Sequence, residues 1–65
     1  MEETIWRTAH VLIELHGDEA ALFAAWRADE LFAKDDFVGC AYFHRVARAI
    51  QELDRSTPRG GETAN

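Results

Sequence analysis

The chain has little of what small proteins use to build disulfide frameworks or nucleotide sites. It contains one cysteine, Cys40, and one proline, Pro58. A lone cysteine excludes a disulfide within the chain and is typical of a reducing compartment. The sequence also lacks a glycine-rich phosphate loop and a glycine-flanked nucleophilic serine. We therefore expect a cytoplasmic protein that is not an enzyme and holds no cofactor.

Long hydrophobic runs are missing as well. No stretch approaches the roughly 18 apolar residues that a membrane helix needs. The first residues, MEETIWRTAHVL, carry acids where a signal peptide carries bases. The formal net charge is −5, so DNA and RNA should be repelled on average. These features predict no membrane partner and no nucleic-acid partner.

Alternating strand patterns are almost absent, whereas helical periodicity recurs in three segments. The chain has 65 residues, 48% of them hydrophobic, which suits one small folded domain. We predict an all-α, compact three-helix bundle over residues 1–54, with helices at about 3–16, 19–34 and 37–53. A helical hairpin crossed by another helix fits the same pattern. Residues 55–65, RSTPRGGETAN, are predicted to be a disordered tail.

Each predicted helix has an apolar face expected to form the core. In the first helix this face consists of Ile5, Ala9, Leu12, Ile13 and His16. In the second helix it consists of Ala21, Leu22, Ala25, Trp26, Ala28, Phe32 and Ala33. In the third helix it consists of Val38, Tyr42, Val46, Ala49, Ile50 and Leu53.

Two short segments are predicted to be corners between these helices. Gly17 can adopt the left-handed conformation that ends a helix, and Asp18 has the side chain of an N-cap for the next one. In the stretch AKDDFVG, Lys34 suits a helix C-terminus, and Asp35 or Asp36 suits the following N-cap. The HGD triplet at residues 16–18 is therefore interpreted mainly as a helix stop and a helix start.

Three residues on the predicted apolar faces are candidates for a buried polar network. Asp29 falls inside the apolar stripe of the second helix, where an unpaired carboxylate would cost several kcal/mol. His16, the Tyr42 hydroxyl, a tryptophan N–H or an arginine could be its partner. We expect a structural network of His16, Asp29 and Tyr42, and a polar interface or ligand site is the alternative.

Cys40 and His44 are a second pair of candidate site residues, because both side chains can bind a metal ion. They lie four residues apart on the third helix and so share a face, a spacing that two zinc ligands can use. A tetrahedral site needs two further ligands; His10 and an acid are the candidates, and nothing brackets the pair at close spacing. The expected state is a small, partly buried cysteine beside an exposed histidine, with no metal.

Several apolar side chains fall outside the predicted core stripes. Phe23 lies among charges near Arg27, Phe37 opens the third helix opposite its core face, and Val11 lies at the edge of the first helix. Two exposed phenylalanines are unusual on so small a chain and would favour self-association or a partner. Phe23, Arg27, Phe37 and Val11 are the predicted interaction residues, with a homodimer favoured.

Four short motifs together carry a resemblance to a known family. They are W-x(2)-A at Trp6 and Ala9, HGD-x-A at residues 16–20, D-x(2)-G at Asp36 and Gly39, and H-x(2)-A-x-A-I-x(2)-L at residues 44–53. The chain resembles, over about residues 5–54, a family of short alphaproteobacterial proteins described only as a domain of unknown function. The family commonly has a tryptophan near the position of Phe43, which this chain lacks, so a shared aromatic site is in doubt. The resemblance implies a small helical bacterial protein and transfers no catalytic residues.

The function predicted from these features is protein–protein interaction or self-association. One alternative is a small-ligand or metal-binding domain that uses Asp29, His16 and Tyr42, or Cys40 and His44. Another is an acidic decoy that inhibits a nucleic-acid-binding protein, whose partner binding would weaken steeply with salt.

Overall fold

The computed structural model describes residues 2–56, and these residues are almost entirely helical. Helical backbone forms two uninterrupted runs, residues 2–33 and 37–56, and no strand occurs among these residues. A 3-10 turn, Gly17–Glu19, divides the first run into α1, Glu2–His16, and α2, Ala20–Ala33. The second run is α3, Phe37–Ser56. The all-α prediction is confirmed.

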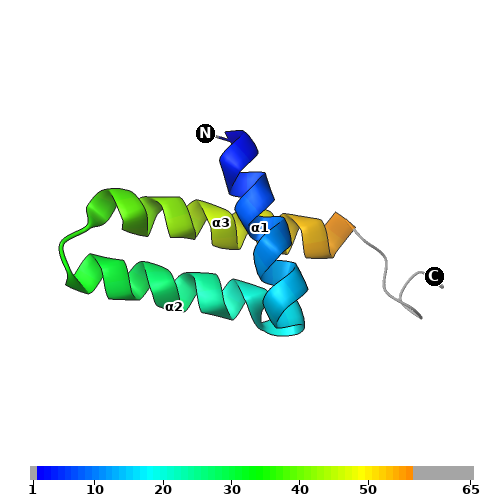
Figure 1. Cartoon of the computed structure of the whole chain (residues 1–65), viewed down its shortest axis with the longest axis horizontal. Helices are drawn as coiled ribbons and strands as arrows, with labels where there is room; N and C mark the ends of the chain where they lie inside the picture. The colour runs from blue at the N-terminus through cyan, green and yellow to red at the C-terminus, as the bar shows by residue number, and fades with distance from the viewer. Residues whose placement is uncertain (1, 57–65) are drawn as a thin grey trace.

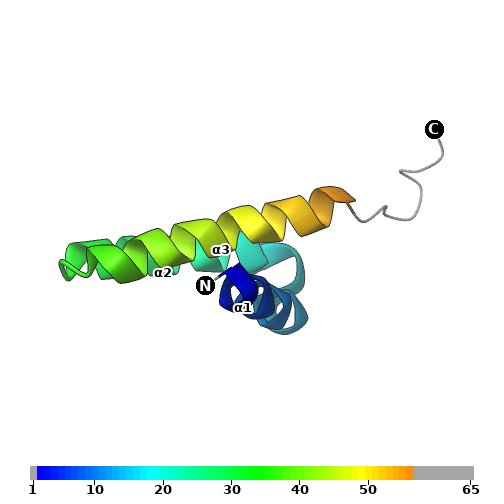
Figure 2. The same ribbon diagram turned by 90° about the horizontal axis from the view of Figure 1, so that it is seen from above.

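The helices are arranged as a hairpin crossed by a third helix. α2 and α3 run antiparallel, side by side, and α1 crosses them at a steep angle near the start of α2 (Figures 1 and 2). The half of the hairpin that holds the connection between α2 and α3 extends beyond α1 (Figure 1). The predicted compact bundle is therefore correct only in its helical content, and the hairpin alternative describes the arrangement.

The predicted helix boundaries agree with the observed ones to within a few residues. α3 continues to Ser56, so the first two residues of the predicted tail are helical. Residues 57–65, the rest of that predicted tail, lie outside the described residues.

The core lies where α1 crosses the hairpin, and the faces predicted for α1 and α3 supply much of it. Ile5, Ala9 and Leu12 are buried on one face of α1, because residues three and four apart share a side of a helix. Val46, Ala49 and Ile50 meet them from α3. These six positions were all predicted to be core.

The face predicted for α2 is wrong except at Ala28, which is buried as predicted. The buried residues are Ala20, Ala24 and Ala28, spaced four apart, whereas Leu22 and Trp26 from the predicted stripe are 70% and 56% exposed. The reason is that α2 is apolar on almost every side, with charges only at Arg27, Asp29 and Glu30. Such a helix has no single apolar face in its sequence, and alanines permit the closest approach of neighbouring helices.

Candidate functional site

The first corner confirms the role of Gly17 and corrects that of Asp18. α1 ends at His16, and Gly17 has φ 58°, the left-handed conformation expected of it. Asp18 lies inside the 3-10 turn, and α2 begins only at Ala20. Glu19 therefore occupies the N-cap position, and its side chain makes no capping hydrogen bond. The negative charges of Asp18 and Glu19 still lie near the positive end of α2.

The second corner is a Schellman motif that closes α2. The Asp35 N–H donates to the Phe32 carbonyl at 3.0 Å, and the Asp36 N–H donates to the Leu31 carbonyl at 2.8 Å. These are the two backbone bonds of that motif, with Lys34 as the C-cap and Asp35, at φ 65°, in the left-handed position. Asp35 therefore takes the place that glycine usually holds.

Asp36 is the N-cap of α3, which resolves the choice between Asp35 and Asp36. The Gly39 N–H donates to Asp36 Oδ1 at 2.9 Å, and the Cys40 N–H donates to the Asp36 carbonyl at 3.0 Å. A Cβ on Gly39 would lie 2.7 Å from Asp36 Oδ2 and 3.0 Å from Leu31 Cδ1. Gly39 thus leaves the room that the capping carboxylate occupies.

The predicted network of His16, Asp29 and Tyr42 does not form. Asp29 is exposed on the side of α2 that faces away from the core, because the buried face is the alanine face. Its carboxylate therefore keeps contact with water and needs no buried partner. His16 is half-buried and stacks on Phe23, with ring centroids 4.3 Å apart and an interplanar angle of 17°.

Tyr42 instead connects α3 to α1. Its hydroxyl lies 2.7 Å from Thr8 Oγ1 and donates a longer bond of 3.4 Å to the Thr4 carbonyl. The half-buried ring packs against the core. Thr8 is thus the partner that the sequence prediction missed. It lies on the core side of α1, three residues after Ile5 and four before Leu12, and this position was the available signal.

Cys40 is buried and His44 is exposed, as expected from the sequence. Within residues 2–56, no group of three or more histidine, cysteine, aspartate or glutamate side chains is placed to hold a metal ion. Among these residues, the fold therefore brings no further metal ligands next to Cys40 and His44.

The four predicted interaction residues have different surroundings. Val11 and Phe37 are exposed, as predicted. Phe23 is not: it is half-buried and packs between the His16 ring and the core, with Trp26 5.8 Å away. Arg27 is also half-buried and pairs with Glu30, its Nη1 lying 2.8 Å from Oε1.

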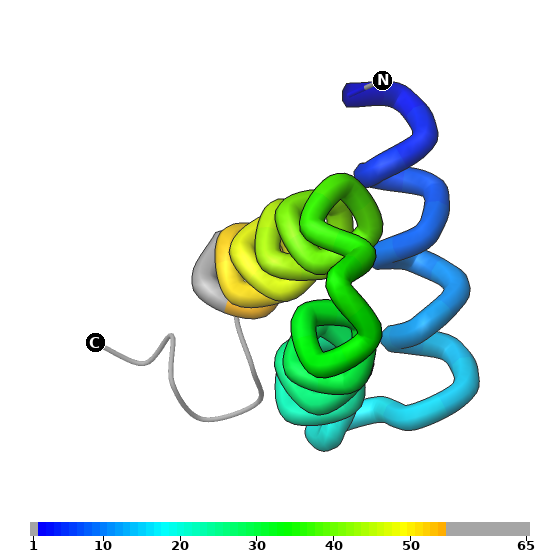
Figure 3. Tube along the Cα trace, turned by 90° about the vertical axis from the view of Figure 1, so that its left-hand side faces the viewer, coloured from blue at the N-terminus to red at the C-terminus, as the bar shows by residue number. Residues whose placement is uncertain are grey.

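The outward side of α2 carries an apolar surface that the sequence prediction assigned to the core. We call this surface the α2 outer strip. It consists of Leu22, Ala25, Trp26, Asp29, Phe32 and Ala33, of which only Asp29 is charged. α3 and α1 occupy two sides of α2, and no other described element covers the remaining sides (Figure 3). Ala25 is half-buried at the edge of the strip, and its other members are exposed.

Apolar surface continues from this strip at both of its ends. Near the start of α2, Leu22 and Trp26 line a shallow groove together with Phe23 and His16. At the hairpin connection, Phe32 meets Phe37 in an edge-to-face contact with centroids 5.4 Å apart. The signal for this surface was present in the sequence, since α2 has too few charges to cover its outward side.

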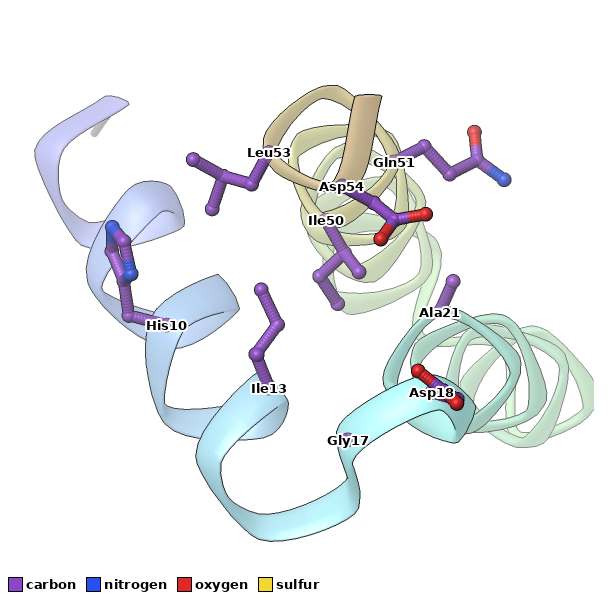
Figure 4. Close-up of a pocket in the computed structure, with 9 residues that line it drawn as sticks. All are labelled: His10, Ile13, Gly17, Asp18, Ala21, Ile50, Gln51, Leu53 and Asp54. Atoms are coloured by element: carbon purple, nitrogen blue, oxygen red, sulfur yellow. The ribbon is translucent and has the colours of Figure 1, made fainter. Parts of the chain in front are cut away.

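A separate cleft of about 550 Å³ lies between the end of α1, the 3-10 turn and the end of α3. Ile13, Ile50 and Leu53 point into it from α1 and α3 (Figure 4). Its polar lining residues are His10, Asp18, Gln51 and Asp54. The sequence prediction missed this cleft, because the crossing angle of α1 creates it.

No protein family, curated protein or solved structure matches the chain. The resemblance to the alphaproteobacterial family stays a prediction. Within residues 2–56, no helix has both the length and the apolar composition to cross a membrane.

Proposed function

We propose that this chain is a small helical interaction module, which acts by binding a protein surface rather than by catalysis. The observation that carries the proposal is the α2 outer strip. Leu22, Trp26 and Phe32 expose more than half of their surface on one helix. Large exposed apolar patches are typical of protein interaction sites, and tryptophan is a common anchor residue in them.

We further propose that the protein works in the cytoplasm. Cys40 is a free, buried thiol, which suits a reducing compartment.

Site-specific photo-crosslinking tests the interaction proposal. In cells that naturally produce the chain, a photoreactive amino acid at position 26 should form covalent adducts with a protein partner, which can be a second copy or a different protein. The same amino acid at position 14, where Glu14 is exposed on α1, is the matched control and should form few adducts. Equal yields from both positions, or none from either, would contradict the proposal.

The cleft between α1, the 3-10 turn and α3 favours a second candidate function, the binding of a small ligand. Its volume of about 550 Å³ lies within the range of small-molecule sites. The apolar side chains of Ile13, Ile50 and Leu53 would contact an apolar body, and the exposed carboxylate of Asp18 would attract a positive group.

A panel of alkyl and aromatic amines tests this second candidate. Binding should perturb the NMR signals of Ile13 and Leu53, and Asp18→Asn should weaken it. Neutral analogues of the same shape are the control. Unperturbed cleft signals at millimolar amine would remove the candidate.

A further inference from the structure

The packing of this protein places small side chains inside and large ones outside. Ten apolar residues are buried in the described part of the chain, and five of them are alanines. Eight large hydrophobic residues are exposed in the same part of the chain. Because burial of apolar surface stabilises a fold by roughly 25 cal/mol per Å², an alanine-rich core stabilises an isolated chain weakly. The surface that would stabilise it most is still in contact with water.

The α2 outer strip has the spacing of a helix-packing surface. Three pairs of its residues are seven apart, which keeps each pair on one side of a helix. These pairs are Leu22 and Asp29, Ala25 and Phe32, and Trp26 and Ala33. Large residues alternate with alanines, so a second helix can approach closely at the alanines. At 1.5 Å per residue the strip is roughly 17 Å long, enough for three turns of a partner helix.

We propose that the partner of this strip is the same strip of a second copy, so that two α2 helices pack antiparallel across a two-fold axis. This inference rests on the proposed function and names its partner. Symmetric contact of one patch with itself is the commonest way in which small proteins associate. Antiparallel packing brings the Leu22 end of each helix to the Ala33 end of the other, so large side chains meet small ones.

The large exposed apolar side chains supply about half of the area that such a dimer needs. Leu22, Trp26, Phe32 and the adjoining Phe37 are each at least 56% exposed. At on the order of 100 Å² each, these four side chains present roughly 400 Å². A standard interface buries about 800 Å² per partner, and the alanines and polar rim supply the remainder.

The distribution of charge favours this face over the other surfaces for self-association, although Asp29 opposes it. The chain carries a net charge of −5, so most other surfaces of two copies repel each other. The strip carries one charge, Asp29, while Arg27 and Glu30 beside it neutralise each other. Antiparallel packing holds Asp29 near the middle of the interface, where its carboxylate loses water, so this charge weakens the dimer.

Sedimentation equilibrium of the purified full chain, from about 1 to 100 µM, tests the dimer. Leu22→Glu should raise the dimer dissociation constant at least 30-fold. Leu15→Glu is the matched control, since Leu15 on α1 is also 70% exposed. It should change the constant less than about threefold. Equal weakening by both variants would overturn the assignment to α2.

Asp29→Asn is a gain-of-affinity test that a misfolded variant cannot imitate. It should tighten the dimer about tenfold, because the amide costs less to bury than the carboxylate. In a Trp6→Phe background, the emission of Trp26 should shift to the blue as the protein concentration rises. A looser dimer, or an emission maximum independent of concentration, would contradict the proposal.

A chain that is monomeric at about 100 µM would overturn the homodimer. The proposed function would survive that result if position 26 still crosslinks to a different protein in cells. It would fail with the homodimer if position 26 forms no adduct, or no more adducts than position 14.

Discussion

The two corners of this protein perform the same task with different residues. At the first corner glycine occupies the left-handed position, Gly17, and no side chain caps the next helix. At the second corner aspartate occupies the left-handed position, Asp35, and Asp36 caps α3. The first corner thus depends on the backbone freedom of one glycine, and the second on side-chain and backbone hydrogen bonds. Substitutions in the two corners should therefore have different effects.

Gly17→Ala should have the largest effect in this comparison. Nothing lies within 4 Å of a Cβ at this position, so the cost comes from the left-handed backbone alone. We expect the free energy of unfolding to fall by about 1–2 kcal/mol. Urea denaturation at one protein concentration measures it. A chemically synthesised chain with D-alanine at position 17 is the control, and it should be at least as stable as the natural chain. Equal losses with L- and D-alanine would contradict the conformational explanation.

Asp36→Ala should lower the free energy of unfolding by about 1 kcal/mol, because it removes the hydrogen bond from the Gly39 N–H. Asp18→Ala is the matched control and should cost only a few tenths of a kcal/mol, the value of a charge near a helix start. Thermal unfolding of both variants at equal concentration compares them. A larger loss of stability for Asp18→Ala would show that Asp18 caps α2 more strongly than Asp36 caps α3.

Gly39→Ala tests whether Gly39 leaves room for the cap. The new Cβ would press on the Asp36 carboxylate and on Leu31. We expect a loss of stability of about 1 kcal/mol, comparable to loss of the cap itself. In an Asp36→Ala background the same change should be neutral or stabilising, since alanine favours a helix interior over glycine. The double-mutant cycle should therefore show coupling of about 1 kcal/mol, and additive effects would refute the steric explanation.

Asp35→Gly should have the smallest effect and the opposite sign. Glycine removes the strain of φ 65° but increases the entropy of the unfolded chain. The net result should be a gain of about 0.5 kcal/mol in the free energy of unfolding. Lys34→Gly is the control, because Lys34 has φ −95° and should gain nothing. Hydrogen exchange of the Asp36 amide, which closes the Schellman motif, provides a local measurement.

The helices were predicted well from the sequence because the residues that begin and end them act locally. Gly17 ends α1, and Asp36 caps α3, through interactions within a few residues along the chain. Most of the core faces of α1 and α3 were also predictable, since polar residues cover much of their outward sides. Val38 is the exception: it was predicted to be core and is 80% exposed. Ile5, Leu12, Val46 and Ile50 are buried as that pattern requires.

The predictions failed where the outcome depended on α2. Its sequence places apolar residues on nearly every side, so the side of α2 with the smallest side chains packs against the other helices. Ala24 is buried and Trp26 is exposed. That choice also moved Asp29 to the surface and brought Phe23 against His16, so the predicted polar network and the predicted exposure of Phe23 were both wrong.

The sequence by itself determined the helical class, the positions of the corners and most of the core faces of α1 and α3. Helix propensity, capping and periodicity act over a few residues, so each can be inferred from a short stretch. Only the tertiary structure decided the inward face of α2, the contact of Tyr42 with Thr8, and the cleft below α1. These features depend on how closely the helices approach and on the angle at which they cross. Both are set by the packing of side chains that are far apart in the sequence.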